Sequence, residues 1–177
     1  MKKVLLLTLA VICISSLAYS QNVGTIDIFG DGQLTTCNVT AGGLFSVYVA
    51  HTNSGGALAS RFRIDHPATF NFLGDTPAFP LALGNSETGI AVSYNTCQTG
   101  TFLVLTVNYF DMGTGTCEWM TILPDQTAAQ PSVGIVDCDE VRWDSQQAGQ
   151  ARVNPDASCT CNVPVEETTW GGIKALY

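Results

Sequence analysis

Large apolar residues recur at every second position in several short segments of the chain, a period typical of β-strands with one buried face. Segments 44–50 and 90–94 both show this alternation. Segment 58–64 shows it most clearly, because its apolar side chains share one face while Arg61 and Arg63 lie on the other. We therefore expect one-sided strands at these three positions.

Other segments extend the strand pattern. Residues 101–110 are apolar on both faces, which predicts a central strand covered on both sides and paired as a hairpin with 90–94. The Asn- and Gly-containing residues 53–56 predict a turn, and residues 71–80 predict a loop because they contain two prolines. Further strands are expected at 119–123 and 133–143, with shorter ones at 26–29 and 35–39.

The number and spacing of these segments define a fold class. Seven to nine short strands, about ten residues apart, predict an all-β protein. We expect a single immunoglobulin-like β-sandwich of antiparallel strands, held together by disulfides. Helical periodicity is confined to the last ten residues, where a short C-terminal helical tail is expected.

The first twenty residues have the pattern of an export signal. Two lysines precede an apolar stretch at 4–17, and Ala18-Tyr19-Ser20 fits the small-x-small cleavage pattern. No other apolar run approaches the ~20 residues of a membrane-spanning helix, so the mature chain is expected to be secreted, extracellular or at the cell surface. The domain organisation predicted is a signal peptide at 1–20, a β-sandwich at 21–161, and a spacer with a docking or sorting tail at 162–177.

The charge of the mature chain limits the classes of partner that it can bind. Cleavage after Ser20 leaves 157 residues with 5 basic and 15 acidic side chains, a net charge of −10. This excludes a nucleic-acid binder, which needs clustered Lys and Arg. Charged residues are only 12% of the chain, and the mean hydropathy is +0.21, so disorder driven by excess charge is also excluded.

Cysteines supply the covalent framework that we expect. Cys13 lies in the signal, and an even number in an exported chain predicts three disulfides of open connectivity. Cys159 and Cys161 are too close in sequence to bridge each other comfortably, so each should pair with a different upstream partner, while Cys117 and Cys138 could close the loop between them. Zinc is the alternative, but its usual Cys-x2-Cys spacing is missing. The six mature cysteines are Cys37, Cys97, Cys117, Cys138, Cys159 and Cys161.

Candidate catalytic residues are few. The chain has two histidines, His51 at the end of a predicted strand and His66 before a proline, and neither belongs to a Gly-x-Ser-x-Gly or His-Glu-x-x-His motif. We interpret both as loop histidines whose polar atoms bond to water or backbone. A secreted hydrolase is a hypothesis only if one of them lies beside a carboxylate and a hydroxyl in a cleft.

No cofactor is expected, with calcium as the alternative. Asp27 and Asp31 belong to a short loop with two glycines that could form one side of a calcium site, although Asp-Gly is commonest simply as a turn. A second acidic cluster, 137–140, is interpreted as a solvated strand edge. Asn38-Val39-Thr40 fits the glycosylation acceptor pattern.

Aromatic residues are the candidates for ligand binding. Phe70, Phe72 and Phe79 lie in or beside the predicted loop at 71–80, and exposed aromatics on a β-sandwich can stack on sugar rings or anchor a protein. The alternative is that they fill the core between the two sheets.

The tail has its own pattern. Trp170, Ile173 and Tyr177 would share one face of a helix too short to be stable alone, and Leu176 lies beside them. We therefore predict a docking or address peptide, the alternative being that Trp170 packs onto the sandwich.

Two resemblances accompany these patterns. The ending at 167–177 resembles a Thr-Trp-Gly-x-Ile-Lys-x-Leu-Tyr tail found on uncharacterised exported proteins of uncultured Gram-negative bacteria. Segments 48–51, 84–89 and 136–138 resemble a cysteine-containing domain of the same group. The Gly-rich pair of strands from Gly42 to Asp65 is similar to cohesin and carbohydrate-binding sandwiches, which implies a cohesin-like β-sandwich.

These observations favour a non-enzymatic, extracellular binding or surface-structural module whose partner is a protein or a glycan. The alternative is a self-assembling subunit of a filament or surface layer, since an acidic, disulfide-held sandwich suits a durable polymer. A secreted hydrolase is the second alternative.

Overall fold

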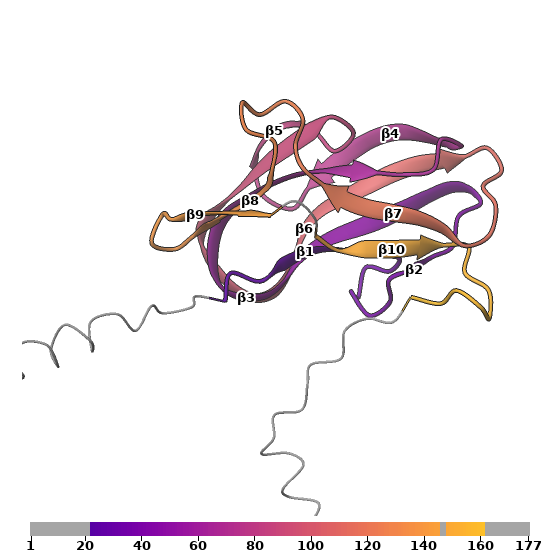
Figure 1. Cartoon of the computed structure of the whole chain (residues 1–177), viewed down its shortest axis with the longest axis horizontal. Helices are drawn as coiled ribbons and strands as arrows, with labels where there is room; N and C mark the ends of the chain where they lie inside the picture. The colour runs from indigo at the N-terminus through magenta and orange to yellow at the C-terminus, as the bar shows by residue number, and fades with distance from the viewer. Residues whose placement is uncertain (1–21, 146–147, 162–177) are drawn as a thin grey trace, which may run out of the picture.

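The computed structural model describes residues 22–145 and 148–161, and within these ranges the chain is all-β (Figure 1). The expected signal peptide and the tail residues Trp170, Ile173, Leu176 and Tyr177 lie outside the described residues. Within the described ranges, the structure contains no helix with the length and apolarity needed to cross a membrane.

Ten strands make up the described part of the chain, one more than the upper end of the predicted range. Their bounds are β1 Thr25–Phe29, β2 Asn38–Val39, β3 Gly43–Asp65, β4 Phe70–Pro77, β5 Leu81–Asn85, β6 Gly89–Asp111, β7 Glu118–Leu123, β8 Val133–Asp137, β9 Arg142–Ser145 and β10 Gln150–Val153.

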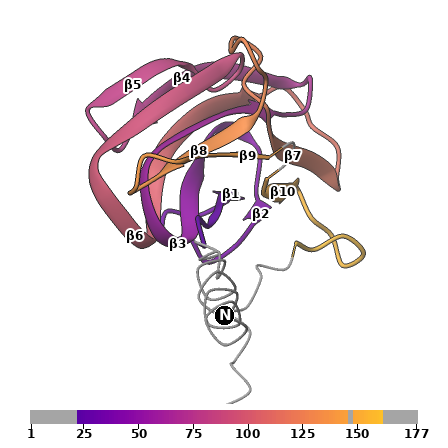
Figure 2. The ribbon, with the colours of Figure 1, turned by 60° about the vertical axis from the view of Figure 1, so that its left-hand side comes forward.

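Two strands of 23 residues each, β3 and β6, form a long antiparallel ribbon at the centre of the fold. Their register runs from Gly43 opposite Asp111 to Phe62 opposite Ile90. Midway, bulges interrupt the pairing between Val49 and Ala59. Bulges let a paired ribbon turn a corner, and Figures 1 and 2 show the two strands curving together.

This bend explains two errors in the sequence-based prediction. The expected turn at 53–56 is instead a bulged part of β3, in which Asn53 and Gly56 have φ values of 52° and 152°. Segments 90–94 and 101–110 are two parts of one strand, β6, rather than hairpin partners. A bulged bend and a tight turn both use Gly and Asn, so their local sequences look alike.

The bend folds the ribbon back on itself, which places its two halves in opposite layers of a sandwich. The first layer contains β1, the start of β3, the end of β6, and β4. The second contains β5, the start of β6, the end of β3, β8 and β9. Aromatic rings meet between the layers, with centroids 5.0 Å apart for Tyr94 and Phe102 and 4.9 Å apart for His66 and Tyr109.

Strand β7 pairs with the end of β3 and extends the second layer through β10 to β2. Strands β10 and β2 run parallel, and this is the one departure from antiparallel pairing among the described strands. The Gly149 N–H donates to the Ile26 carbonyl at 2.7 Å. This bond joins the β10 side of the second layer to β1 and closes that side of the sandwich.

Inward-facing side chains of both layers form one hydrophobic core. The three predicted one-sided strands bury most of the expected face, but Leu58, expected inward, is half-buried because the bulge between Ala57 and Ala59 interrupts the alternation and buries Ala57 instead. The buried residues of the expected faces are Val47, Val49, Phe62, Ile64, Ile90, Val92 and Tyr94. The prediction that residues 101–110 are covered on both faces is wrong at the end of that segment, where Phe110 is 44% exposed.

Two other boundaries differ from the prediction. Most of the expected loop at 71–80 is strand β4, which pairs with β6 and places Pro77 at its end, where a missing N–H interrupts little of the ladder. The expected single strand at 133–143 is the hairpin β8–β9, with Glu140 at a φ of 62° in its turn.

Three disulfides confirm the expected covalent framework. They are Cys37–Cys161, Cys97–Cys138 and Cys117–Cys159. Cys159 and Cys161 bond to different upstream partners, as expected. The suggested bridge from Cys117 to Cys138 is wrong, because each of these cysteines pairs with another segment rather than closing its own loop.

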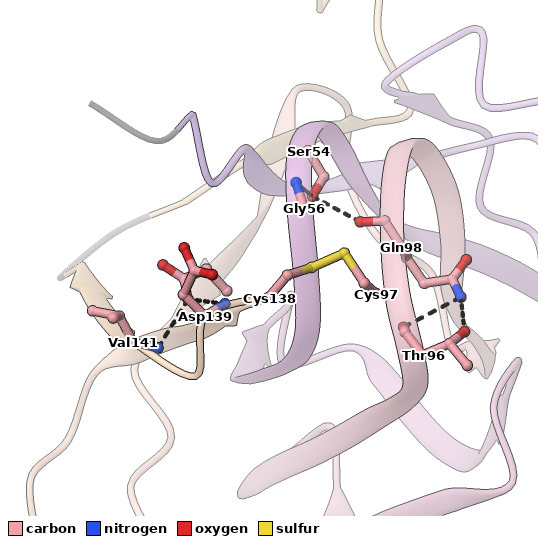
Figure 3. Close-up of a disulfide and its surroundings, with 9 residues drawn as sticks. Ser54, Gly56, Thr96, Cys97, Gln98, Cys138, Asp139 and Val141 are labelled. Atoms are coloured by element: carbon pink, nitrogen blue, oxygen red, sulfur yellow. Dashed lines mark hydrogen bonds between the residues drawn. A yellow bond between two sulfur atoms is a disulfide. The ribbon is translucent and has the colours of Figure 1, made fainter. Parts of the chain in front are cut away.

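The Cys97–Cys138 bridge crosses the bend directly over Gly56 (Figure 3). A Cβ atom built on Gly56 would lie 3.0 Å from the Cys138 sulfur and 3.4 Å from the Cys97 sulfur. Gly56 also has a φ of 152°, which side-chain-bearing residues rarely adopt. The bridge therefore packs against bare backbone of β3 and fixes the bend.

The framework predicts the thiol content of the mature protein. Because all six cysteines are paired, protein unfolded in guanidinium chloride without reductant should react with no thiol reagent until reductant is added. Two or more titratable thiols per chain would contradict the framework.

Replacing Gly56 tests the packing at the bend. We expect Gly56→Ala to lower the free energy of unfolding by about 1–3 kcal/mol, since the new Cβ is strained and crowds the disulfide. The matched control is Gly42→Ala, whose Cβ would meet no atom within 4 Å. Equal urea midpoints for the two variants would show that the bend tolerates a side chain.

Candidate functional site

His51 lies in the core rather than in a loop. It is a fully buried residue within β3, and its Nε2 lies 2.6 Å from the Val23 carbonyl oxygen. Because a carbonyl only accepts, Nε2 carries the proton, and Nδ1 then accepts from the Tyr94 hydroxyl at 3.3 Å. Burial lowers the pKa of His51 and raises that of the Tyr94 hydroxyl. Both ring nitrogens are therefore committed to structural hydrogen bonds.

His66 lies beside a carboxylate, the arrangement under which a hydrolase would become a stronger hypothesis. Its Nε2 is 3.5 Å from a Glu87 oxygen and its Nδ1 is 3.0 Å from the Pro67 carbonyl. The nearby Ser86 is fully buried and donates its hydroxyl to Asp75 at 2.7 Å. Burial raises the pKa of Asp75, although the Ser86 hydroxyl and amide both donate to its carboxylate. The Ser86 hydroxyl is therefore bonded to Asp75. The group of His66, Glu87 and Ser86 provides no nucleophile that His66 activates.

The predicted aromatic binding residues pack inward. Phe70 is 4% exposed, with its ring centroid 4.8 Å from that of Phe45. The ring centroids of Phe72 and Tyr109 are 6.1 Å apart, and those of Phe79 and Tyr94 are 4.9 Å apart. The three residues thus contribute to the core, the alternative left open by the sequence, and a ligand contact through Phe72 or Phe79 stays a prediction.

The candidate calcium ligands are hydrogen-bonded by the chain itself. Asp27 accepts from the hydroxyl of Thr25 on its own strand and from the hydroxyl of Thr52 across the β1–β3 pair. Asp31 accepts from the hydroxyl and the amide of Thr35. Although burial opposes them, these and neighbouring backbone hydrogen bonds hold the pKa of Asp31 below its usual value. Calcium binding here stays a prediction.

Two other sequence-based candidates have structural roles. Asp137, expected at a solvated edge, is buried and accepts from the Trp143 indole N–H at 2.7 Å. The Asn38 amide of the glycosylation pattern accepts from the Cys161 N–H at 2.8 Å and donates to the Cys161 carbonyl at 3.4 Å. Within the described ranges, the one group with metal-ligand spacing is Cys117, Asp156 and Cys159, and its two sulfurs are joined in a disulfide.

The outer side of the second layer exposes two large apolar side chains to a partner. On β5, Leu81 and Leu83 point outward and are 54% and 70% exposed, while Ala82 between them packs on the core. The sequence-based prediction did not include these leucines, although the alternation Leu-Ala-Leu directly after Pro80 was a signal for a short one-sided strand.

Register extends this surface across four strands. Leu81 lies beside Ser93 of β6, which pairs with Ala59 of β3, which pairs with Val136 of β8. The neighbouring row is Leu83, Ala91, Arg61 and Gly134. Apart from Arg61 and Val136, the side chains beyond the leucines are small, and Gly134 is buried beside Asp144 and Arg142. These eight residues are called the flat face below.

Arg61 lies on β3 within the flat face and is held by polar partners. Its guanidinium donates to the Ser132 hydroxyl at 3.1 Å and to the Gln130 carbonyl at 3.3 Å, and its Nε lies 3.7 Å from Asp125. The Ser132 hydroxyl in turn donates to Asp144 at 2.6 Å, which, with Arg142, holds the pKa of Asp144 below its usual value. The flat face therefore combines exposed leucines with a positioned charged group.

Comparison with solved structures defines the class of fold as cohesin-like. A cohesin module from a family 33 glycoside hydrolase of Clostridium perfringens aligns with a TM-score of 0.52 at 12% identity, covering 76% of this chain and 98% of that module. A non-cellulosomal cohesin from the archaeon Archaeoglobus fulgidus aligns with a TM-score of 0.51 at 10% identity, covering 76% and 94%. At these identities the likeness concerns the fold alone. No family model and no curated protein matches the sequence.

The burial of His51 predicts how stability depends on pH. Its lowered pKa means that, as the pH falls below the ordinary value of 6.5, the unfolded chain gains a proton that the folded chain resists. The free energy of unfolding should therefore fall as the pH falls, by at most about 1.4 kcal/mol per pH unit for this group.

Urea denaturation between about pH 5.5 and 7.5 measures this slope. His51→Gln can still donate to Val23 and accept from Tyr94, but it cannot titrate, so its slope should be shallower. A wild-type slope in His51→Gln would assign the dependence to other groups.

Proposed function

We propose that the protein is a non-enzymatic, extracellular protein-binding module that contacts its partner through the flat face. The exposure of Leu81 and Leu83 on a rigid sheet is the observation that carries this proposal. When a complementary protein covers such exposed leucines, their apolar surface is removed from water, and this burial favours binding.

Three further observations support a binding module. Both histidines make structural contacts, and Ser86 donates to Asp75, so the described candidates for catalysis are engaged in holding the fold. Three disulfides and the export-signal pattern suit an oxidising, extracellular location. The fold is similar to that of cohesin modules, one of which is a module of a glycoside hydrolase.

The flat face suits a protein more than a small ligand. Its outward residues come from four adjacent strands, so they form a broad surface rather than a concave pocket of the kind that encloses small molecules. The Arg61 side chain is 25% exposed and already held by Asp125, Ser132 and Gln130, so this polar group would lose little conformational entropy when a partner covers it.

Paired substitutions test the proposal. The double variant Leu81→Asp/Leu83→Asp places two charges on the flat face and should abolish capture of a partner from the secreted proteins of the producing organism. Leu44→Asp is the matched control, because Leu44 is 71% exposed on β3 in the first layer, away from the flat face. It should capture the same protein as the wild type, and all three proteins should unfold at similar temperatures.

Two outcomes would redirect this proposal. A partner captured equally by wild type and double variant contradicts a role for the flat face. Light scattering that shows wild-type oligomers and a monomeric double variant would make the partner a second copy of this chain, which is the self-assembling alternative.

A further inference from the structure

Trp119 is an exposed aromatic residue on β7, in the part of the second layer where β7 and β10 lie side by side (Figure 1). This part of the layer is separate from the four strands of the flat face. Along β7, Met120 and Ile122 are fully buried, so the alternate residue Trp119 points outward. Along β10, Ala151 and Val153 are buried in the same way and Arg152 points outward. Trp119 and Arg152 are direct cross-strand partners.

Arg152 lies against one face of the Trp119 ring. Its guanidinium carbon is 3.2 Å from the ring centroid, and its Nη1 donates to the Cys117 carbonyl at 2.8 Å. The Arg152 Nε is buried from solvent. The guanidinium therefore lies between the ring and the backbone, and the cation–π contact and the Cys117 bond fix the ring in place.

The other face of the ring is open. Trp119 is 46% exposed although Arg152 covers one side, so the exposed area comes from the opposite face and the ring edges. Its outward neighbours on the two strands are polar, with Thr121 beside it on β7 and Gln150 opposite Thr121. The Gln150 amide and the Thr121 hydroxyl lie 3.4 Å apart, which leaves further donor and acceptor capacity on both groups.

We propose that Trp119 is a stacking platform for a neutral sugar ring. A pyranose with equatorial hydroxyls presents a flat face of C–H groups, whose partial positive charge suits the negative face of an aromatic ring. Its hydroxyls project at the ring edge, where Thr121 and Gln150 can exchange hydrogen bonds with them. The immobilised indole loses little conformational entropy on binding, which favours even a small contact.

The surroundings favour a saccharide over other occupants. A protein hot spot would be centred on apolar neighbours that exclude water, whereas the outward neighbours of this ring on β7 and β10 are Thr121 and Gln150, and Asn38 lies beyond Arg152. A cationic ligand is disfavoured because Arg152 already occupies the opposite face of the ring. The site is separate from the flat face, so the proposal does not depend on the protein-binding function.

One platform holds one sugar unit, so the affinity should be weak and best detected with polymers. The probes are neutral polysaccharides cast into native gels: hydroxyethylcellulose and arabinoxylan, with dextran for a different linkage. The wild-type mature chain should be retarded by at least one of them. Trp119→Ala should weaken that retardation by about tenfold or more in apparent affinity, since it removes both the stacking and the buried ring area.

Two further variants make the test specific. Phe110→Ala removes another exposed aromatic, 44% exposed on the first layer, and should be retarded as strongly as the wild type. Trp119→Phe keeps a smaller ring and should retain part of the retardation. Circular dichroism and melting temperatures establish that each variant is folded.

The outcomes are decisive for the platform. No retardation of the wild type in any of the three gels overturns the proposal, and so does undiminished retardation of folded Trp119→Ala. Loss of retardation in Phe110→Ala as well as Trp119→Ala would place the contact elsewhere and also overturn it. None of these outcomes bears on the Leu81 and Leu83 variants, so the two functions fail or stand separately.

Discussion

The bend in the β3–β6 ribbon is the constraint on which the rest of the structure depends. A straight ribbon of that length would leave one face of each half without a partner. Because the ribbon folds at the bulges, its two halves face each other and share a core, in which Tyr94 packs against Phe102. Gly56 lets the Cys97–Cys138 bridge lie against the backbone at this point. The outer strands then add to edges whose positions the ribbon has already determined.

Local alternation was sufficient to predict the all-β class and the inward-facing side chains of the clearest one-sided segments, because these follow from neighbours along the chain; strand boundaries such as those of β4 and of the β8–β9 hairpin were not predicted. Phe62 and Ile64 are buried as their spacing indicated. The bend was not predictable in this way, because Asn53 and Gly56 suit a hairpin turn as well as a bulge. Disulfide partners were equally inaccessible, since Cys37 and Cys161 meet only through the complete fold.

The proposed binding surfaces were harder to predict than the core, and for a related reason. Aromatic content drew attention to Phe70, Phe72 and Phe79, which the sandwich uses for packing. Exposure depends on strand pairing rather than on residue type. Leu83 gains its importance from the small residues opposite it, and Trp119 from the arginine beneath its ring. Neither relationship is visible until the register is known.

The Cys37–Cys161 bridge also determines how the molecule would carry mechanical load. It joins residues 124 positions apart, close to the two ends of the described chain. Tension applied through the chain ends would pass from the N-terminal segment across this bond and leave at Cys161, bypassing the loop between the two cysteines. Among the described strands, β1 alone lies in that path. A module tethered at both ends could therefore be pulled without stretching the chain that forms β2 to β10 or the surfaces on those strands.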